Sequence, residues 1–258
     1  MNLENFIQPD WPAPAHVCAY VTLRTGGVSL TPYDSFNLAA HVGDNPDHVK
    51  ENRLRLKQAL DLPTEPVWLQ QTHSTIVLRA SENNREKEAD ASYADQPNHV
   101  CAVLTGDCLP VLFCRQDGTQ VAAVHAGWRG LANGIIEKTV QKLNDATSSK
   151  HPLLAWLGPA IGHHAYEIGD EVRDIFLMHD SNAAAAFHLS TQNRWFANLY
   201  ELARLRLNQV GVTQIYGGNF CTYSDNTRFF SARRDGQKTG RMASLIWMLN
   251  LNKPVSVL

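Results

Sequence analysis

Three segments of the sequence carry a potential metal ligand in a polar turn next to a short apolar run. The segments are Trp68–His73, Leu104–Cys108 and Val124–Gly130, and the candidate ligands are His73, Cys108 and His125. Because side chains at strand ends gather along one edge of a sheet, we expect these three to meet. Two imidazoles and a thiolate suit Zn²⁺ and leave a fourth position open, which is typical of catalytic sites. Cys108 follows His73 by 35 residues and precedes His125 by 17, spacings that match no zinc finger, so residue type alone carries this prediction.

Each candidate also has a structural interpretation. A histidine after a strand is more often a turn residue, and a cysteine within an apolar run is more often a small core residue. We assign Cys101 and Cys114 to the core on this ground. Cys108 differs because Asp107 precedes it and a proline follows closely, so we expect its thiol at a break between strands, where a thiolate is accessible. Asp107 is a candidate proton carrier or a turn cap.

The segment after His125 predicts a neighbouring anion site. Gly127, Gly130 and a helix beginning at Leu131 would present free backbone N–H groups, and Arg129 adds a planar cation. Phosphate or carboxylate would suit such a pocket. Arg24, in the Arg-Thr-Gly-Gly segment, and Arg233 are further candidates, and the loop from Gly158 to Gly162 is a candidate pocket wall. His163 and His164 are left out because adjacent side chains point apart.

Composition narrows the class of protein. The 258 residues include 23 Lys plus Arg and 25 Asp plus Glu, giving a formal net charge of -2, so we expect neither nucleic acid nor membrane as a partner. The first fourteen residues contain no apolar run, which predicts neither a secretory signal nor a spanning helix. Five cysteines without a CxxC pair favour a reducing, cytoplasmic location. The oligomeric state stays open, and a monomer is compatible with the sequence.

The elements that must position these residues alternate along the chain. We expect helices after Asn45-Pro46, after Gly130, over about 170–178 and over 196–210. Short apolar runs predict strands at 17–23, 67–69, 75–78, 100–104, 110–114, 121–124, 153–157, 214–216 and 228–231. Several are joined by turns too short for a parallel crossover, so we predict one α/β (α+β) domain over residues 1–258, a layered sandwich of mixed β-sheets flanked by helices.

Seven motifs together give the chain a family resemblance. They are RTGGVS from Arg24, SFNL from Ser35, GDNP from Gly43, QTH ending at His73, DC at Asp107–Cys108, HAGWRG from His125 and GPAIG from Gly158. The chain resembles the YfiH family, also called the laccase-domain or polyphenol oxidoreductase family, from about Pro9 to Met248. One departure is Gly106, where the family usually has alanine before the Asp-Cys pair; this loosens the turn but removes no functional side chain.

The resemblance implies an α/β/β/α sandwich related to the cysteine-hydrolase-like fold of cytotoxic necrotizing factor. It implies zinc held by the positions of His73, Cys108 and His125, which with Asp107 are the expected catalytic residues. It also implies phosphorolysis of adenosine, inosine and methylthioadenosine, with adenosine deamination as a side activity. The expected partners are thus a purine nucleoside and phosphate, and the expected substrate-binding residues are Arg24, Asn37, Gln71, Arg129 and Arg233.

Three other functions remain as alternatives. A cysteine hydrolase would use Cys108 as nucleophile, His125 as base and Asp107 or Gln71 as support, and related bacterial proteins suggest removal of L-serine from cell-wall precursors. A multicopper oxidase is disfavoured because none of the eleven histidines forms a His-x-His pair, although one copper could replace zinc. A non-enzymatic protein with structural zinc would need a fourth ligand, for which Cys221 is the candidate.

Overall fold

The structure is a computed structural model that describes residues 6–81, 87–190 and 193–250. Its centre is a six-stranded sheet in the order β12-β8-β6-β7-β4-β3. These strands are β12 (Gln214–Gly217), β8 (Leu153–Leu157), β6 (Leu109–Arg115), β7 (Val121–Ala126), β4 (Ala91–Ala94) and β3 (Val77–Arg79). The pairs β12 with β8 and β3 with β4 are parallel, whereas the other neighbours are antiparallel. The sheet is therefore mixed, as its short connections predict.

A second sheet packs on the first and is antiparallel throughout. Its order is β1-β2-β13-β5, from β1 (Phe6–Ile7), β2 (Val17–Thr22), β13 (Met242–Met248) and β5 (Cys101–Thr105). A small third sheet consists of β10 (Phe187–Leu189), β11 (Trp195–Ala197) and β9 (Glu167–Ile168). β13 lies between β2 and β5, so strands from opposite ends of the chain share one sheet.

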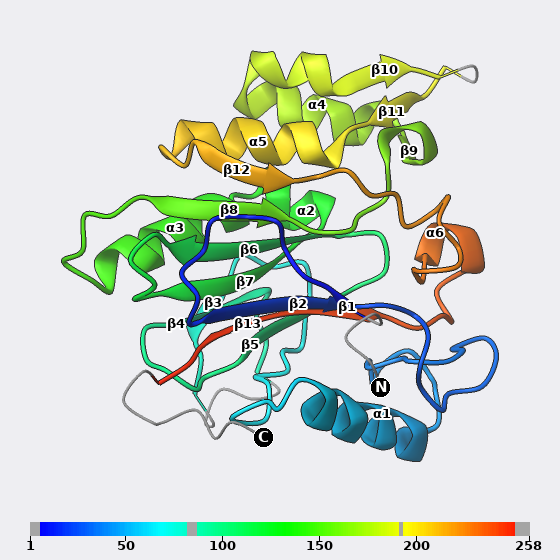
Figure 1. Cartoon of the computed structure of the whole chain (residues 1–258). Helices are drawn as coiled ribbons and strands as arrows, with labels where there is room; N and C mark the ends of the chain where they lie inside the picture. The colour runs from blue at the N-terminus through cyan, green and yellow to red at the C-terminus, as the bar shows by residue number, and fades with distance from the viewer. Residues whose placement is uncertain (1–5, 82–86, 191–192, 251–258) are drawn as a thin grey trace.

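Helices cover the outer faces of the two large sheets. They are α1 (Pro46–Ala59), α2 (Trp128–Ala132), α3 (Ile135–Asp145), α4 (Asp170–His179), α5 (Leu199–Gln209) and α6 (Ala232–Asp235), with 3₁₀ turns η3 (His163–Ala165) and η4 (Ser181–Ala186). Figure 1 shows α1 against the four-stranded sheet, and α3 and α5 on the far side of the six-stranded sheet, with α4 and the small sheet beyond α5. No helix in the described ranges is long and apolar enough to cross a membrane.

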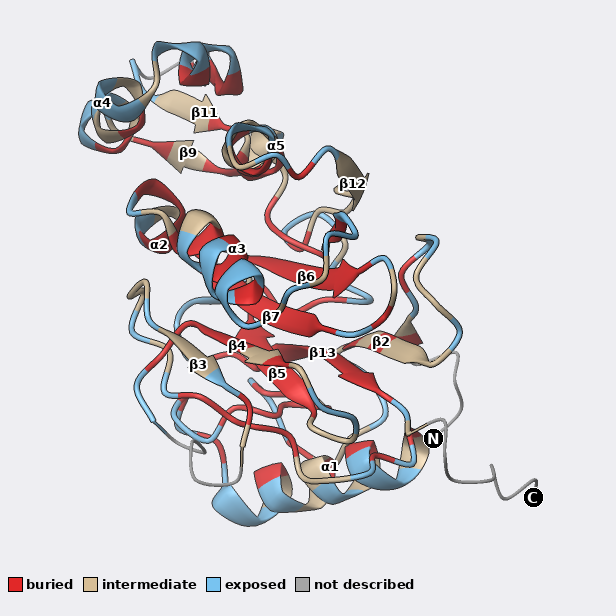
Figure 2. Cartoon of the chain, turned by 90° about the vertical axis from the view of Figure 1, so that its left-hand side faces the viewer, coloured by how far each residue is buried: buried red, intermediate tan, exposed pale blue. Residues whose placement is uncertain are grey.

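The central strands β5, β6, β7, β8 and β13 are buried on both faces, which explains their continuous apolar sequences. In β6, Leu112 packs between the two sheets, whereas its neighbours Val111 and Phe113 pack under the helices, and all three are fully buried. Figure 2 shows the same contrast across the molecule, with buried strands at the centre and exposed outer helix faces. The prediction of a layered, mixed α/β sandwich is confirmed by this arrangement.

Four predicted elements differ from the observed ones. The helix predicted from residue 196 begins at Leu199, because Trp195–Ala197 pairs as β11 and the Asn198 side chain caps the helix. The helix predicted after Gly130 is two helices, broken at Gly134, which has a left-handed φ of 90°.

The two other differences concern predicted strands. The strand predicted at 67–69 makes one isolated bridge, from Val67 to Cys101. No strand forms at 228–231, since Asp225 accepts hydrogen bonds from the Arg228 N–H and from Thr227 and closes a turn. At 67–69 one bridge forms in place of a row of strand hydrogen bonds, and at 228–231 the side-chain contacts of Asp225 form a turn in place of a strand.

A single buried amide ties α1 to the loop that precedes it. Asn52 is fully buried; its Oδ1 accepts from the Val28 N–H, and its Nδ2 donates to Ser29 Oγ and to the carbonyls of Ser35 and Asn37. The side chain thus satisfies polar groups that water cannot reach, and it fixes the path of the loop.

Asn52→Ala should lower the free energy of unfolding by about 2–4 kcal/mol, because it leaves several buried polar groups without partners. Urea denaturation followed by fluorescence measures this loss. Lys50→Ala, on the exposed side of the same helix, is the control and should change stability by less than about 0.5 kcal/mol. Equal stability of both variants would contradict the role given to Asn52.

Candidate metal centre

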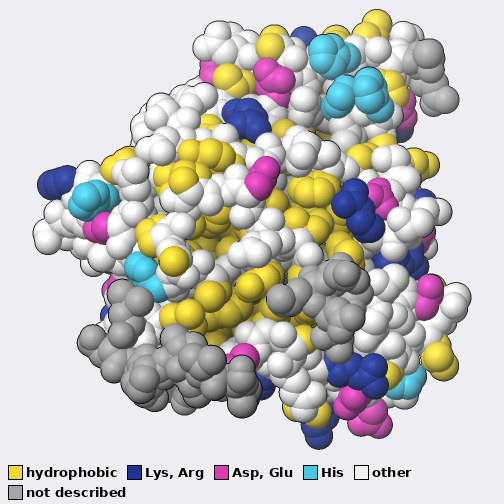
Figure 3. Space-filling view, in the orientation of Figure 1, with side chains coloured by type: hydrophobic (Ala, Val, Ile, Leu, Met, Phe, Trp, Pro, Cys, Tyr) yellow, Lys and Arg dark blue, Asp and Glu magenta, His cyan; other side chains and the backbone are white. Residues whose placement is uncertain are grey.

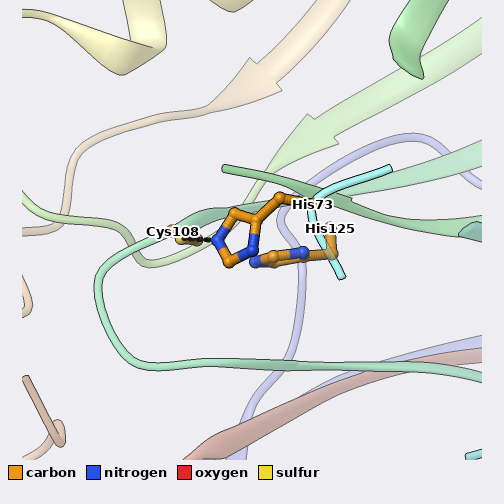
Figure 4. Close-up of side chains that lie close together, drawn as sticks. All are labelled: His73, Cys108 and His125. Atoms are coloured by element: carbon orange, nitrogen blue, oxygen red, sulfur yellow. Dashed lines mark hydrogen bonds between the residues drawn. The ribbon is translucent and has the colours of Figure 1, made fainter. Parts of the chain in front are cut away.

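His73, Cys108 and His125 meet at one edge of the six-stranded sheet. One ligand atom from each lies within 4.8 Å of the others, and among the described residues this is the one group of at least three His, Cys, Asp or Glu side chains so arranged. Cys108 Sγ lies 3.8 Å from His73 Nε2, and the two imidazole rings are edge to face with centroids 4.9 Å apart. Figure 4 shows the three side chains converging on one point.

Unusual backbone conformations turn two of these side chains inward. His73 has a φ of 62°, and Asp107, just before Cys108, has a φ of 106°. Both lie in the left-handed region that non-glycine residues seldom adopt. The break at Asp107 separates β5 from β6 and leaves Cys108 half-buried at the start of β6, as expected from the sequence. His125 is held differently, because it lies within β7 opposite Pro110.

Asp90 organises both histidines, and no motif or spacing in the sequence pointed to it. Its fully buried carboxylate lies 2.7 Å from His125 Nδ1 and accepts the backbone N–H groups of His73 and Ser74 at 3.0 and 2.6 Å. Burial raises the pKa of Asp90, but the hydrogen bonds from His125 and Ser74 outweigh it and hold this pKa below its usual value. A carboxylate on Nδ1 leaves Nε2 of His125 for a metal.

Electrostatics favour a thiolate at Cys108. Burial acts to raise the pKa of the thiol, but the charge and hydrogen bonds of His125 and His73 lower it to about 6. Burial likewise acts to lower the pKa of His125, and the Cys108 thiolate and Asp90 raise it instead. Cys101 and Cys114 are buried with pKa values raised to about 12, which confirms them as core residues.

The three side chains form a ligand set of the kind that binds a transition metal, with ligand atoms all within 4.8 Å of one another. Zn–N and Zn–S bonds of about 2.0 and 2.3 Å require nitrogen and sulfur ligands roughly 3.5 Å apart, close to the observed 3.8 Å. Gly127 makes room for this approach, because a Cβ there would lie 2.7 Å from His73 Cδ2 and 3.1 Å from Cys108 Sγ. Cys221 does not complete the set, since its Sγ accepts the Gly162 N–H and lines a separate cavity.

The candidate ligands lie in a cavity of about 730 Å³. The predicted residues that line it are Gln71, His73, Asp107, Cys108, His125, Arg129 and Arg233. Gln71 is fixed there by two hydrogen bonds to the backbone of Leu104. Residues that the sequence did not single out also line it, namely His41, Thr105, Trp128, Tyr166, Gln237 and Arg241. Thr105 and Trp128 belong to segments that carry the candidate ligands, whereas the other four come from distant parts of the chain, where no local pattern could have identified them.

Two predicted substrate-binding residues lie elsewhere. Arg24 donates to the carbonyl of Asp34 and packs over the ring of Phe230, and it lines a different surface pocket. Asn37 is fully buried and hydrogen-bonded to Asp44, and its Oδ1 accepts the backbone N–H of Arg241 at 3.1 Å. Asn37 therefore does not line the cavity. It holds the backbone of Arg241, which does.

The Asp107 carboxylate is held by hydrogen bonds from distant segments of the chain. It accepts Thr222 Oγ1 at 2.6 Å and the backbone N–H of Arg233 at 2.7 Å, which ties α6 to the turn. Burial raises the pKa of Asp107, against the effect of these hydrogen bonds. The bonds suit the turn-capping role, and the raised pKa suits proton transfer, so both interpretations of Asp107 remain.

The protein is an α/β sandwich of two stacked sheets with helices outside them. The His-Cys-His group at the ends of its central strands is a candidate catalytic metal centre. Residues 18–249 match the family model described as multi-copper polyphenol oxidoreductase laccase. A Shigella flexneri protein named purine nucleoside phosphorylase YfiH is 55% identical over 248 residues, covering 96% of this chain and 100% of that protein. The chain belongs to this laccase-domain family, the YfiH family, which confirms the resemblance seen in its motifs.

Solved structures agree with this assignment. A Neisseria meningitidis protein described as DUF152 is 48% identical with a TM-score of 0.89, covering 95% of this chain and 100% of that chain. The YlmD protein of Geobacillus stearothermophilus is 27% identical with a TM-score of 0.87, covering 97% of this chain and 98% of that chain. The fold is thus the fold of YfiH and DUF152 proteins.

Asp90→Asn should weaken zinc binding by about tenfold to a hundredfold, because an amide holds the His125 tautomer and the turn at His73 less firmly. Competition with a chromophoric chelator measures the dissociation constant. Asp95→Asn, which alters a carboxylate paired with Arg79 away from the cavity, is the matched control and should bind zinc as the unaltered chain does. Equal zinc affinity in Asp90→Asn would refute the positioning role.

Proposed function

We propose that the protein is a zinc-dependent purine nucleoside phosphorylase that converts adenosine, inosine or methylthioadenosine, with phosphate, to the free base and a sugar 1-phosphate. The observation that carries the proposal is the His73, Cys108 and His125 group within an arginine-lined cavity of about 730 Å³. That volume is in the usual range for a small-molecule site. The names of the relatives in Shigella flexneri and Escherichia coli, both purine nucleoside phosphorylase YfiH, support it.

The chain's own residues would bind and orient the two substrates. His73, Cys108 and His125 would hold the metal, which when bound supplies a Lewis acid that polarises a substrate atom. In phosphorolysis, a phosphate oxygen bonds to the sugar carbon as its bond to the base nitrogen breaks, and the departing base takes up a proton. Arg129 and Arg233 line the cavity and would balance anionic charge there.

Asp107 is the proposed proton carrier. Its place in the cavity wall, next to Cys108, and the burial that raises its pKa above the usual value suit a carboxyl group that exchanges a proton with substrate. The same group would serve adenosine deamination, which the proposal includes as a side activity. Gln71, fixed by the backbone of Leu104, would present a rigid polar surface to the nucleoside.

A cysteine hydrolase is the second candidate, and one observation favours it. His125 lies between the Cys108 thiolate and the carboxylate of Asp90, with Nδ1 2.7 Å from the carboxylate, in the order nucleophile, base and orienting acid. Asp90 takes the supporting place for which the sequence suggested Asp107 or Gln71. Such an enzyme would remove L-serine from cell-wall precursors. A thiolate bound to metal is a poorer nucleophile, so metal content separates the two candidates.

The remaining alternatives have less support. A multicopper oxidase needs several copper sites, whereas the described residues contain one group of three ligands, in which a single copper could replace zinc. A structural zinc needs a fourth protein ligand, and Cys221 lines another cavity.

The enzyme would be one domain that acts in the cytoplasm on small molecules, and its monomers would be able to work alone. On the face drawn in Figure 3, Lys and Arg side chains are interspersed with Asp and Glu, so a one-signed surface of the kind that nucleic acids need is missing from the described part of this face.

Cys108→Ala should lose both zinc and phosphate-dependent release of adenine from adenosine, because it removes the thiolate ligand. Elemental analysis and chromatography of the reaction measure the two properties, with about one zinc per chain expected in the unaltered protein. Cys18→Ala, at a half-buried position in β2, is the matched control and should keep both. Metal-free, inactive wild-type protein whose Cys108 is rapidly alkylated would overturn the phosphorylase in favour of the hydrolase.

A further inference from the structure

Arg241 is a cation of the metal-site cavity whose nearest negative groups, Cys108 and Asp107, interact with it without forming an ion pair among the described residues. It precedes β13 and is half-buried. Its Nη1 donates to the carbonyls of Thr239 and Gly240 at 2.8 and 2.9 Å, and Nη2 makes a longer contact of 3.4 Å with the carbonyl of Gln237. Within the described residues no carboxylate forms an ion pair with Arg241, and its Nε makes no hydrogen bond. A guanidinium stays charged under all ordinary conditions, so this burial favours an external anion.

The nearby negative groups are already engaged. Asp107 is the one carboxylate among the described residues that line the cavity, and its oxygens accept from Thr222 and from the backbone of Arg233. The Cys108 thiolate faces the two histidines. Three arginines line the same cavity, so its net charge is positive before any substrate enters.

Thr105 is a second, independent sign of a ligand. Its side chain is 2% exposed and lines the same cavity, and its Oγ1 has no hydrogen-bond partner among the described residues. A buried hydroxyl without a partner is costly, and such groups are rare in folded proteins. Rotation of the Thr105 side chain toward the cavity would let a ligand oxygen provide the acceptor that the hydroxyl lacks.

Thr105 and Arg241 lie side by side. Thr105 pairs with Met242, the residue after Arg241, across β5 and β13. Gly106 follows Thr105, and a Cβ there would lie 3.0 Å from Arg241 Cδ and 3.5 Å from Nε. Asn37, held by Asp44, accepts the Arg241 backbone N–H and so fixes the start of β13. The hydroxyl and the guanidinium are therefore preorganised on two neighbouring strands.

We propose that Arg241 and Thr105 form the binding subsite for the phosphate ion. A tetrahedral oxyanion would accept from the free Nε edge of Arg241 and from Thr105 Oγ1, next to the metal ligands. The choice of phosphate over other oxyanions rests on the proposed phosphorylase function. Arg129 fits this task less well, because it is exposed and packs over the ring of its neighbour Trp128, and α2 has only five residues.

The test is calorimetric titration of the metal-loaded protein with inorganic phosphate at constant ionic strength. Arg241→Gln should weaken phosphate binding about tenfold to a hundredfold, as loss of a charged donor does, and Thr105→Val by a few-fold. Arg79→Gln, at an exposed side chain outside the cavity, is the matched control and should change the dissociation constant less than about twofold, whereas Arg129→Gln tests the competing assignment. Unchanged binding in Arg241→Gln and Thr105→Val, or loss confined to Arg129→Gln, would overturn the assignment.

Thr105→Val keeps the test decisive if Arg241→Gln folds poorly. Replacing an unpartnered buried hydroxyl by a methyl group should leave the thermal midpoint of the ligand-free protein unchanged or higher. A weaker phosphate affinity in a protein of undiminished stability is therefore the signature of a ligand contact. A Thr105→Val protein that is less stable and binds phosphate normally would mean that the hydroxyl serves the fold.

Further titrations distinguish inorganic phosphate from phosphorylated ligands, and they test the subsite separately from the phosphorylase function. Ribose 1-phosphate should displace inorganic phosphate, whereas binding of a nucleoside 5′-monophosphate without binding of inorganic phosphate would overturn the assignment. Arg241-dependent phosphate binding in a protein that releases no base would uphold the subsite and refute the phosphorylase. Phosphate-dependent base release with an unchanged KM for phosphate in Arg241→Gln would uphold the phosphorylase and refute the subsite.

Discussion

The buried carboxylate of Asp90 is the constraint on which the rest of the site depends. It joins His125, on the central strand β7, to the loop that carries His73, through contacts to the imidazole of His125 and to the backbone N–H groups of His73 and Ser74. A carboxylate with no exposed surface is stable only when its oxygens are fully used. The same bonds that stabilise Asp90 therefore fix the two histidines relative to each other before any metal binds.

The third ligand is positioned by backbone geometry instead. Asp107 adopts a left-handed φ of 106°, and its carboxylate holds Thr222 and the backbone of Arg233. Segments more than a hundred residues apart thus stabilise one turn, whose conformation aims Cys108 at the histidines. Gly127 completes the arrangement, because any larger residue would occupy the space between His73 and Cys108. Strain at the turn is balanced by contacts that reach across the fold.

The sequence predicted what is local and missed what is not. The three ligands were found because each follows an apolar run with a polar turn. Most strands of the two large sheets were found from their apolar composition, but β1, β4 and β13 were not predicted. Asp90 and Arg241 were missed because their roles arise from partners far along the chain, as in the contact of Arg241 with Asn37. The start of the helix predicted from residue 196 was wrong for the same reason, because pairing of β11 with β9 overrides the helical periodicity of the first residues.

The charges of the cavity make the metal and anion sites interdependent. A thiolate with two neutral imidazoles brings one negative charge to a divalent metal, so the bound centre would add to the positive charge of Arg129, Arg233 and Arg241. Asp107, already hydrogen-bonded, offsets only one of these charges. A neutral nucleoside entering alone would leave this field unbalanced, whereas an oxyanion would relieve it in a cavity where water screens charge poorly. The arrangement thus favours an anionic co-substrate beside the metal ligands. The electrostatic attraction on that anion would be strongest at Arg241, which forms no ion pair with a carboxylate among the described residues.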